Sequence, residues 1–169
     1  INDDSDIYGM ICFTPAVGHV QKLVSICKEK NPECITVVGG PHASAVPEET
    51  LAFTKCDTVA VGEGEISFPK YVKRYEQEGK YERILHGEKI QDLDSLELPA
   101  RDLVDNDSYT ATLFHKKTTG IISARGCAYN CAFCDKGVFG PKMRFRSAEN
   151  FLKELREVKE KYGYESYFF

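Results

Sequence analysis

The sequence predicts an α/β fold, in which an open parallel sheet is followed by one further strand-helix-strand unit. Two observations lead to this prediction. Through residues 7–79, short β-prone runs alternate with segments that have helical apolar periodicity. Such alternation is typical of a parallel sheet whose strands are connected by helices. A new β-prone run at 118–123 then begins a second series of strand, loop, helix and strand.

The first strand and the first helix lie between residues 7 and 30. Ile7–Phe13 is an apolar, β-prone run. It is followed by apolar residues whose spacing fits one helix face: Val17, Val20, Leu23, Val24 and Cys27. Pro32 disfavours the helical conformation at the residue before it, so we expect the helix to end there.

Two more strands follow. Ile35–Val38 is a continuous β-branched run, typical of a strand buried on both faces of a parallel sheet, and Gly39–Pro41 ends it. Pro47 suits the first turn of a helix. Thr58–Val61 predicts the next buried strand. The helix after it has an apolar face and ends at Gly79; this face consists of Phe68, Tyr71, Val72 and Tyr75.

The second half of the chain begins with a segment that lacks periodicity. From Gly87 to His115, Asp, Asn and Pro residues indicate turns and irregular chain, which we interpret as an interdomain connection. Thr118–Ser123 predicts a strand that leads into a cysteine-rich loop. Ser147 is a suitable N-cap for the next helix, and Gly163 a suitable C-cap. The aromatic residues that follow predict a final strand.

The composition is that of an ordinary soluble globular protein. The chain is 42% hydrophobic and has a formal net charge of -4, so no overall basic field would attract nucleic acid or an anionic membrane. It has no apolar run of roughly 18 residues that would predict a membrane span, and its first residues do not resemble a signal peptide. We therefore expect a cytoplasmic location. We interpret four scattered cysteines as reduced, buried thiols: Cys12, Cys27, Cys34 and Cys56.

Three further cysteines lie in one short loop, and their spacing indicates an iron-sulfur cluster. Cys127, Cys131 and Cys134 follow the pattern C-x3-C-x2-C. A 4Fe-4S cluster is normally held by four Cys, so three thiolates leave one iron for an exogenous ligand. A zinc site is the alternative, because Cys-x2-Cys pairs also bind zinc. Only His115 and Asp135 lie near enough in sequence to complete a tetrahedron, and neither has a usual zinc-finger spacing.

With an Arg-Gly pair directly before the first Cys and an aromatic residue directly before the third, this loop resembles that of the radical S-adenosylmethionine (radical SAM) superfamily. The resemblance implies that the three Cys hold a 4Fe-4S cluster and that SAM chelates the fourth iron. It also implies that Phe133 packs near the SAM adenine. Arg125 would steady the cluster loop or the SAM carboxylate, or else be a solvated loop residue. Arg144 and Arg146 could contact SAM, but we favour a structural role for them beside Phe145 on an exposed strand.

A second group of motifs follows the first strands. Gly39–Ser44, Pro47–Glu49 and Val61–Glu65 come in this order upstream of the Cys loop. Together they resemble the cobalamin-binding domain of cobalamin-dependent radical SAM enzymes, from about residue 7 to residue 105. The resemblance implies a crevice for the lower face and nucleotide tail of cobalamin, with these rim residues: Thr14, Gly39, Gly40, Pro41, His42, Gly62, Glu63 and Gly64.

One departure from that resemblance concerns the cobalt ligand. The chain lacks the Asp-x-His-x-x-Gly phrase that supplies a cobalt-ligating histidine in other cobalamin proteins. We therefore interpret His42 as a residue that is hydrogen-bonded locally or lines the nucleotide pocket.

The resemblance also implies how the chain is organised. Residues 1–86 would be the C-terminal part of a Rossmann-like cobalamin-binding domain, residues 87–115 an interdomain linker, and residues 116–169 the start of a radical SAM (β/α) barrel with its cluster loop. A complete barrel needs about 200 residues or more, and fewer follow the linker here. We therefore expect the chain to be a piece of a longer protein and to lack SAM cleavage by itself.

The function implied for the parent protein is reductive cleavage of SAM to a 5'-deoxyadenosyl radical, coupled to cobalamin-dependent methyl transfer or rearrangement. Such an enzyme would be a transferase or an oxidoreductase. Its partners would be a small-molecule substrate and an electron donor such as flavodoxin or ferredoxin. The alternatives are a non-catalytic module that binds cobalamin and iron-sulfur, a zinc-binding domain, or a methylthiotransferase, which would be expected to carry a different N-terminal domain.

Overall fold

The computed structural model describes residues 5–109, 112–113 and 115–169. The chain forms two compact units, each made of two stretches of sequence. The first unit comprises Ile1–Ile90 and Tyr129–Pro141, and the second comprises Gln91–Ala128 and Lys142–Phe169. The domain boundaries expected from the sequence, at residues 86 and 116, stay a prediction.

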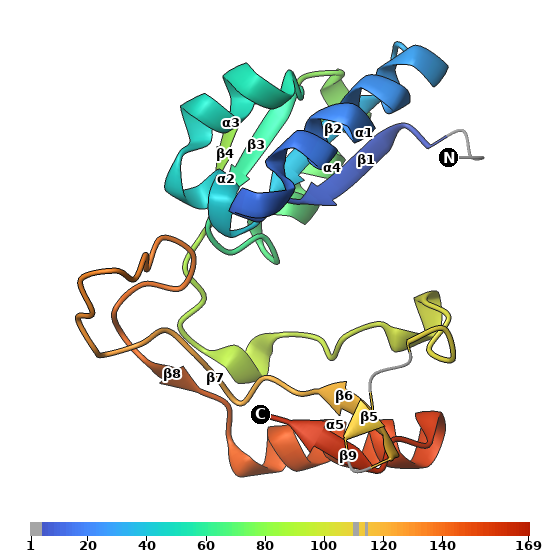
Figure 1. Cartoon of the computed structure of the whole chain (residues 1–169), viewed down its shortest axis with the longest axis vertical. Helices are drawn as coiled ribbons and strands as arrows, with labels where there is room; N and C mark the ends of the chain where they lie inside the picture. Colours follow the sequence, from blue (N-terminus) through green and yellow to red (C-terminus); the bar gives the residue numbers. More distant parts are fainter. Residues whose placement is uncertain (1–4, 110–111, 114) are drawn as a thin grey trace. The chain divides into compact units, whose positions relative to one another are not determined.

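The first unit is built on a four-stranded parallel sheet with the strand order β1-β2-β3-β4 (Figure 1). The strands are β1 (Ile7–Ile11), β2 (Ile35–Gly39), β3 (Thr58–Val61) and β4 (Ile84–His86). The first three confirm the sequence prediction. The fourth was missed because it has only three residues, between Arg83 and Gly87, too few to show a strand pattern.

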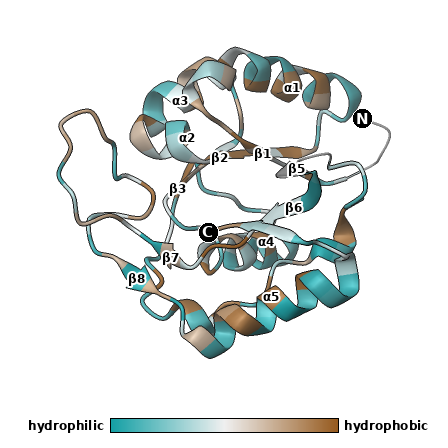
Figure 2. Cartoon of the chain, turned by 60° about the horizontal axis from the view of Figure 1, so that its bottom comes forward, coloured by the Kyte–Doolittle hydropathy of each residue, from teal (hydrophilic) through white to brown (hydrophobic). Residues whose placement is uncertain are grey.

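Helices cover both faces of this sheet. They are α1 (Val17–Lys30), α2 (Pro41–Ala45), α3 (Pro47–Thr54) and α4 (Ser67–Glu78), with a 3-10 turn η1 at Thr14–Ala16. Figure 2 shows α1, α2 and α3 on one face and α4 on the other.

Strand β2 is buried on both faces, as its β-branched run predicted. On one face, Val38 packs with Val24 of α1 and Val59 of β3. On the other, Val37 packs with Tyr71 of α4. The four scattered cysteines are free and buried, which confirms their interpretation as core thiols.

The second unit contains the predicted strand-helix-strand element. Strand β6 (Lys116–Gly120) pairs in parallel with β9 (Ser166–Phe168), and α5 (Ala148–Tyr162) lies between them in the chain. Ser147 caps α5 by accepting a hydrogen bond from Asn150 N at 3.1 Å. The small apolar core of this unit consists of Ile121, Val158 and Tyr164.

Several short elements of the second unit were not expected. Strand β5 (Thr112–Leu113) pairs antiparallel with β6. Strands β7 (Ala124–Arg125) and β8 (Arg144–Phe145) form an antiparallel ribbon whose two strands flank the cysteine loop in the chain. The segment interpreted as a linker contains two 3-10 turns, η2 (Leu93–Ser95) and η3 (Arg101–Leu103). No helix in the described part of the chain is long and apolar enough to cross a bilayer.

Candidate functional site

A cavity of about 500 Å³ opens in the first unit, beside the carboxyl ends of β2 and β3. Ligands of open parallel sheets bind outside the carboxyl ends of the strands, so the position is that of a binding crevice. Five of the rim residues inferred from the sequence line it: Gly39, Gly40, Gly62, Glu63 and Gly64. The rest of the lining is mostly apolar: Gly9, Met10, Val37, Ala60, Glu65, Phe68, Pro69, Val138 and Phe139.

The rim at Gly40 requires glycine. Its φ is 99°, in the region that side chains disfavour, and a Cβ there would lie 2.8 Å from Ile11 Cγ1. The turn is also tied to the end of β1, because Cys12 N donates to Gly39 O at 2.7 Å and His42 N donates to Cys12 O at 3.1 Å. The rim is therefore fixed by backbone hydrogen bonds to the end of β1 and brings backbone close to the cavity.

The other three inferred rim residues do not line the cavity. Thr14 lies in η1, and Pro41 and His42 begin the short helix α2. Thr14 Oγ1 is 3.1 Å from His42 Nδ1, so these two side chains hydrogen-bond to each other. The two residues lie 28 positions apart in the chain, and the role inferred for His42 from the sequence stays a prediction.

Glu63 lines the cavity but has a structural partner. Its side chain is nearly inaccessible, and Oε2 accepts a hydrogen bond from Ile90 N at 3.3 Å. This bond ties the segment after β4 to the loop after β3. The sequence could not show this, because the two residues lie far apart in the chain and no local motif links them.

The three loop cysteines are free and exposed. Cys131 and Cys134 belong to the first unit, where Cys134 N donates to Cys131 O at 3.1 Å, while Cys127 belongs to the second. Phe133 is 93% exposed. Among the described residues, no group of three His, Cys, Asp or Glu is arranged to hold a metal ion. Nevertheless, three accessible thiols in a segment without regular secondary structure are ligands that an iron-sulfur cluster uses. The residue types therefore fit that cofactor.

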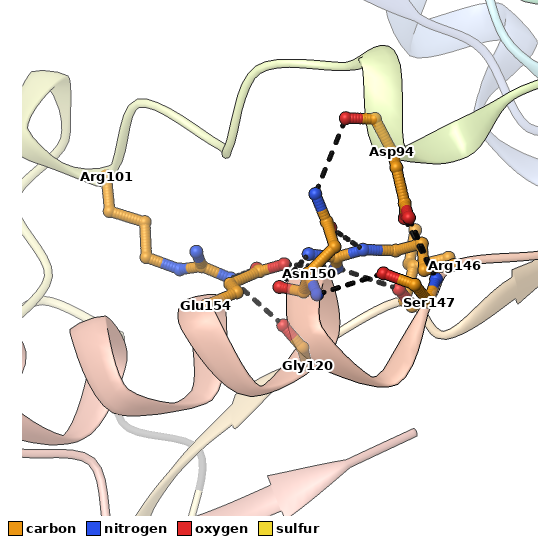
Figure 3. Close-up of polar contacts among 8 residues, drawn as sticks. Asp94, Arg101, Gly120, Arg146, Ser147, Asn150 and Glu154 are labelled. Atoms are coloured by element: carbon orange, nitrogen blue, oxygen red, sulfur yellow. Dashed lines mark hydrogen bonds and ion pairs between the residues drawn. The ribbon is translucent and has the colours of Figure 1, made fainter.

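Arg146, the residue directly after β8, is held by polar contacts within the second unit (Figure 3). Arg146 donates to the carboxylate of Glu154, to Asn150 Oδ1 at 2.7 Å and to Ile122 O at 3.0 Å. In β8, Arg144 is only 5% exposed and Phe145 is 66% exposed, so the expected exposed strand is exposed at one of its two residues. Arg146 neutralises a carboxylate on the buried face of α5, which the sequence alone did not reveal.

The presumed linker supplies the second partner of that carboxylate. Arg101 of η3 donates to Glu154 Oε1 at 2.7 Å and to Gly120 O at 3.2 Å. The Glu154 side chain is 2% exposed, and those of Arg101 and Arg146 are 12% and 9% exposed. We refer to Arg101, Arg146 and Glu154 as the buried charge cluster. It joins three segments of the second unit.

Asp94 fixes the beginning of α5 from the same linker segment. Its Oδ1 accepts from Ser147 N at 2.9 Å, and Asn150 Nδ2 donates to its backbone oxygen at 3.4 Å (Figure 3). The hydrogen bonds from Ser147 lower the pKa of the Asp94 carboxyl. Residues 94–101 are therefore packed structure within the second unit, where sequence indicated only turns.

Arg125 lies in β7 and is half-buried, rather than in a solvated loop. It lines a second cavity, of about 160 Å³, together with Ile122 and the three residues of the buried charge cluster. This cavity lies wholly within the second unit. It is too small for a cofactor such as SAM, since small-molecule sites usually span about 300 Å³ or more.

Comparison with known proteins gave consistent matches. Residues 2–72 match the B12 binding domain family. The chain is 31% identical to an uncharacterized methyltransferase of Pyrococcus horikoshii, over 95% of this chain and 38% of that protein. It is 32% identical to the hopanoid C-3 methylase of Methylococcus capsulatus, over 89% of this chain and 32% of that protein.

A solved structure resembles the whole fold. It is the radical S-adenosylmethionine methyltransferase TsrM from Kitasatospora setae, with tryptophan substrate and a SAM analogue bound. The TM-score is 0.69 at 14% identity, covering 95% of this chain and 36% of that one, so the likeness concerns the fold. The chain spans 38% and 32% of the length of the two curated relatives.

Proposed function

The chain belongs to the radical SAM enzymes that carry a cobalamin-binding domain, and from this premise we propose that it supplies the cobalamin crevice and the cluster loop of a methyltransferase. The observation that carries this proposal is the cavity at the carboxyl ends of β2 and β3. It lies beside the inferred rim glycines, and most of its lining lies within or just beside the residues that match the B12 binding domain. When bound, the cluster would supply the electron that cleaves SAM to a 5'-deoxyadenosyl radical, and cobalamin would carry the transferred methyl group.

The crevice residues would bind cobalamin by shape rather than by charge. Gly39 and Gly40 present bare backbone at the rim, so the ligand can approach the chain closely. Val37, Ala60 and Phe68 give the lining its apolar character and would exclude water from an inserted ring.

The loop residues would hold the cluster and SAM. Cys127, Cys131 and Cys134 are accessible and are not engaged in disulfides. Phe133 is free of the protein core and is therefore available to pack on the SAM adenine. Arg125, held in β7, would orient the chain directly before the first thiolate.

The substrate and the electron donor are proposals at the level of chemical class. The relatives act, by their names, on compounds as different as hopanoids and magnesium-protoporphyrin IX monomethyl ester. We propose a small-molecule substrate, a flavodoxin- or ferredoxin-type donor and a cytoplasmic location, with methyl transfer as the leading reaction and rearrangement as the alternative.

Anaerobic reconstitution tests the proposal. The chain is supplied with iron, sulfide and cobalamin, desalted, and analysed for iron, sulfide and cobalt. We expect about four iron and four sulfide per chain and close to one cobalt. Adding SAM should change the electron paramagnetic resonance spectrum of the reduced cluster. Zinc without sulfide, or cobalt near zero, would contradict the corresponding half of the proposal.

A matched pair of variants separates the cluster from a zinc site. Cys131→Ser should abolish cluster assembly, because only two thiolates would remain. Asp135→Asn should leave it unchanged, since a 4Fe-4S cluster does not need this carboxylate. If instead Asp135→Asn releases the metal as completely as Cys131→Ser does, Asp135 is a ligand and the zinc alternative is favoured.

A second candidate function is a non-catalytic binding module. It is favoured by one observation: the second unit contains a single strand-helix-strand element among its described residues, whereas a barrel takes about 200 residues. We therefore expect the 169-residue chain to bind cluster and cobalamin without turnover. Formation of 5'-deoxyadenosine from SAM and a reductant, measured by chromatography, would contradict this expectation.

A further inference from the structure

The chain that follows the third loop cysteine belongs to the first unit and reaches its cavity. Tyr129–Pro141 clusters with the first unit rather than with the strands that flank it in sequence. Within this segment, Val138 and Phe139 line the same cavity as Gly40 and Gly62. One wall of the crevice is thus made by residues that lie outside the region matching the B12 binding domain.

This wall is part of a folded turn. Gly140 N donates to Lys136 O at 2.8 Å, and Gly137 N donates to Asp135 Oδ1 at 3.0 Å. Gly140 also has a φ of 74°, and a Cβ placed on it would lie 2.1 Å from Lys89 Nζ. The Lys89 side chain therefore passes directly over Gly140, which leaves no room for a side chain at this position.

The cavity lining favours an uncharged, flat group. No Lys or Arg is among its described lining residues, so the lining offers no cationic side chain. Its two carboxylates lie at Glu63, which is bonded to Ile90 N, and at Glu65, which is exposed. Met10, Val37, Ala60 and Phe68 face the same space as Phe139. Such a lining of aliphatic and aromatic side chains best accommodates a flat aromatic ring of a ligand.

We propose that Phe139, supported by Val138, packs on the heteroaromatic base at the end of the cobalamin nucleotide tail. This inference rests on the proposed cobalamin binding and extends it. It means that one continuous peptide, Cys131–Phe139, carries two cluster thiols and a wall of the cobalamin crevice. Loss of the Phe139 ring should weaken binding of the tail and leave binding of the corrin ring unaffected.

The test compares two ligands. Cobalamin carries the nucleotide tail, whereas cobinamide has the same corrin ring without it. Their dissociation constants are measured by equilibrium dialysis with the 169-residue chain and with Phe139→Ala, so the readout does not depend on activity. We expect the variant to bind cobalamin roughly ten- to a hundredfold more weakly, the loss expected for one buried Phe side chain, and cobinamide as wild type does.

Two further variants serve as controls. Tyr129→Ala removes an aromatic ring that is 77% exposed in the same segment and should change neither constant. Phe139→Tyr keeps the ring and should retain most of the cobalamin affinity. Phe139 is itself 37% exposed, so its replacement should not unfold the unit, which circular dichroism verifies.

The possible failures are distinguishable. If the wild-type chain binds neither ligand, the proposed cobalamin crevice is wrong and this inference falls with it. If wild type binds cobalamin and Phe139→Ala binds it equally well, only the inference about Phe139 is overturned. An equal loss of cobalamin and cobinamide would also overturn it, because the ring would then act on the corrin rather than on the tail.

Discussion

The two compact units bury different kinds of side chain. The interior of the first is mainly apolar on both faces of its sheet, with Val38 and Val59 fully buried, and most of its buried polar groups are uncharged hydroxyls. The second has a small apolar core and, beside it, the buried charge cluster around Glu154. Apolar burial stabilises in proportion to the area covered, so its loss is gradual. A buried ion pair contributes little net stability, yet removing one partner leaves an uncompensated charge. We therefore expect the stability of the second unit to depend on far fewer residues than the stability of the first.

The largest expected effect comes from breaking the buried charge cluster. Glu154→Gln removes the carboxylate that pairs with both Arg101 and Arg146 and leaves two guanidinium groups with little exposure. We expect the free energy of unfolding of the second unit to fall by roughly 3–5 kcal/mol. Native-state hydrogen exchange should show faster exchange of α5 amides and little change in β2 and β3.

The matched control for this variant is Glu160→Gln. Glu160 lies on the same helix but is exposed, so its replacement should change stability by less than about 0.5 kcal/mol. If both variants lose the same stability, the buried charge cluster is not the determinant of the second unit.

In the first unit, the corresponding change is a cavity in the sheet core. Val59→Ala removes two methyl groups from a side chain with no exposed surface. We expect a loss of roughly 2–3 kcal/mol, made up of transfer and cavity contributions. Urea unfolding measures it, with Val104→Ala, at a position 47% exposed, as the control. A loss larger than that of Glu154→Gln would reverse the comparison between the units.

The first unit also contains a partly buried ion pair between Lys28 and Asp57. Lys28 Nζ lies 2.7 Å from Asp57 Oδ2, and Thr36 N and Oγ1 both donate to that oxygen at 2.8 Å. Burial alone would raise the pKa of Asp57, but the bonds from Lys28 and Thr36 lower it overall. A folded-state pKa below the unfolded value means that the carboxylate stabilises the fold above pH of about 4 and ceases to do so as pH falls through the folded pKa.

Asp57→Asn tests this pH dependence. At pH 7 we expect the variant to be less stable by about 1.5 kcal/mol, and the difference from wild type should shrink in strongly acidic solution. Urea unfolding at several pH values measures both. Glu33→Gln, at an exposed site, is the control. A difference that stays constant down to pH of about 2 would show that Asp57 does not titrate with a lowered pKa.

The smallest expected effect concerns the beginning of α5. Ser147→Ala removes the hydroxyl that accepts from Asn150 N and should cost about 1 kcal/mol, whereas Ser147→Thr retains the cap. Thermal unfolding compares the two variants. Equal melting temperatures would indicate that the backbone bond from Ser147 N to Asp94, which both variants keep, is sufficient to start the helix.

An element of the fold could be predicted when the pattern that indicates it lies within its own residues. Strands β1, β2 and β3 and helices α1, α4 and α5 each have a run or a periodicity within their own residues, and the sequence predicted them. Strands β4, β7 and β8 have only two or three residues each. They are defined by pairing with residues distant in the sequence, which no local pattern reveals. Helix α2 was not predicted, because its five residues are too few to show a helical periodicity.

The same reasoning applies to the candidate site. The rim glycines could be found because glycine directly after a buried strand is a local signal. Val138 and Phe139 could not, since only the return of the chain to the first unit brings them to the cavity. Asp94 and Arg101 were hidden for the same reason, because their partners on and before α5 lie about fifty residues further along.

The discontinuity of the first unit has a consequence for its biosynthesis. Residues 1–90, which contain the four described strands of the sheet, emerge from the ribosome before residues 129–141. At a translation rate of roughly 5–20 residues per second, synthesis of the residues between these two stretches takes several seconds. Only then can Val138 and Phe139 complete the lining of the cavity. Until Val138 and Phe139 have been synthesised, the residues of β1, β2 and β3 that line the cavity lack this cover.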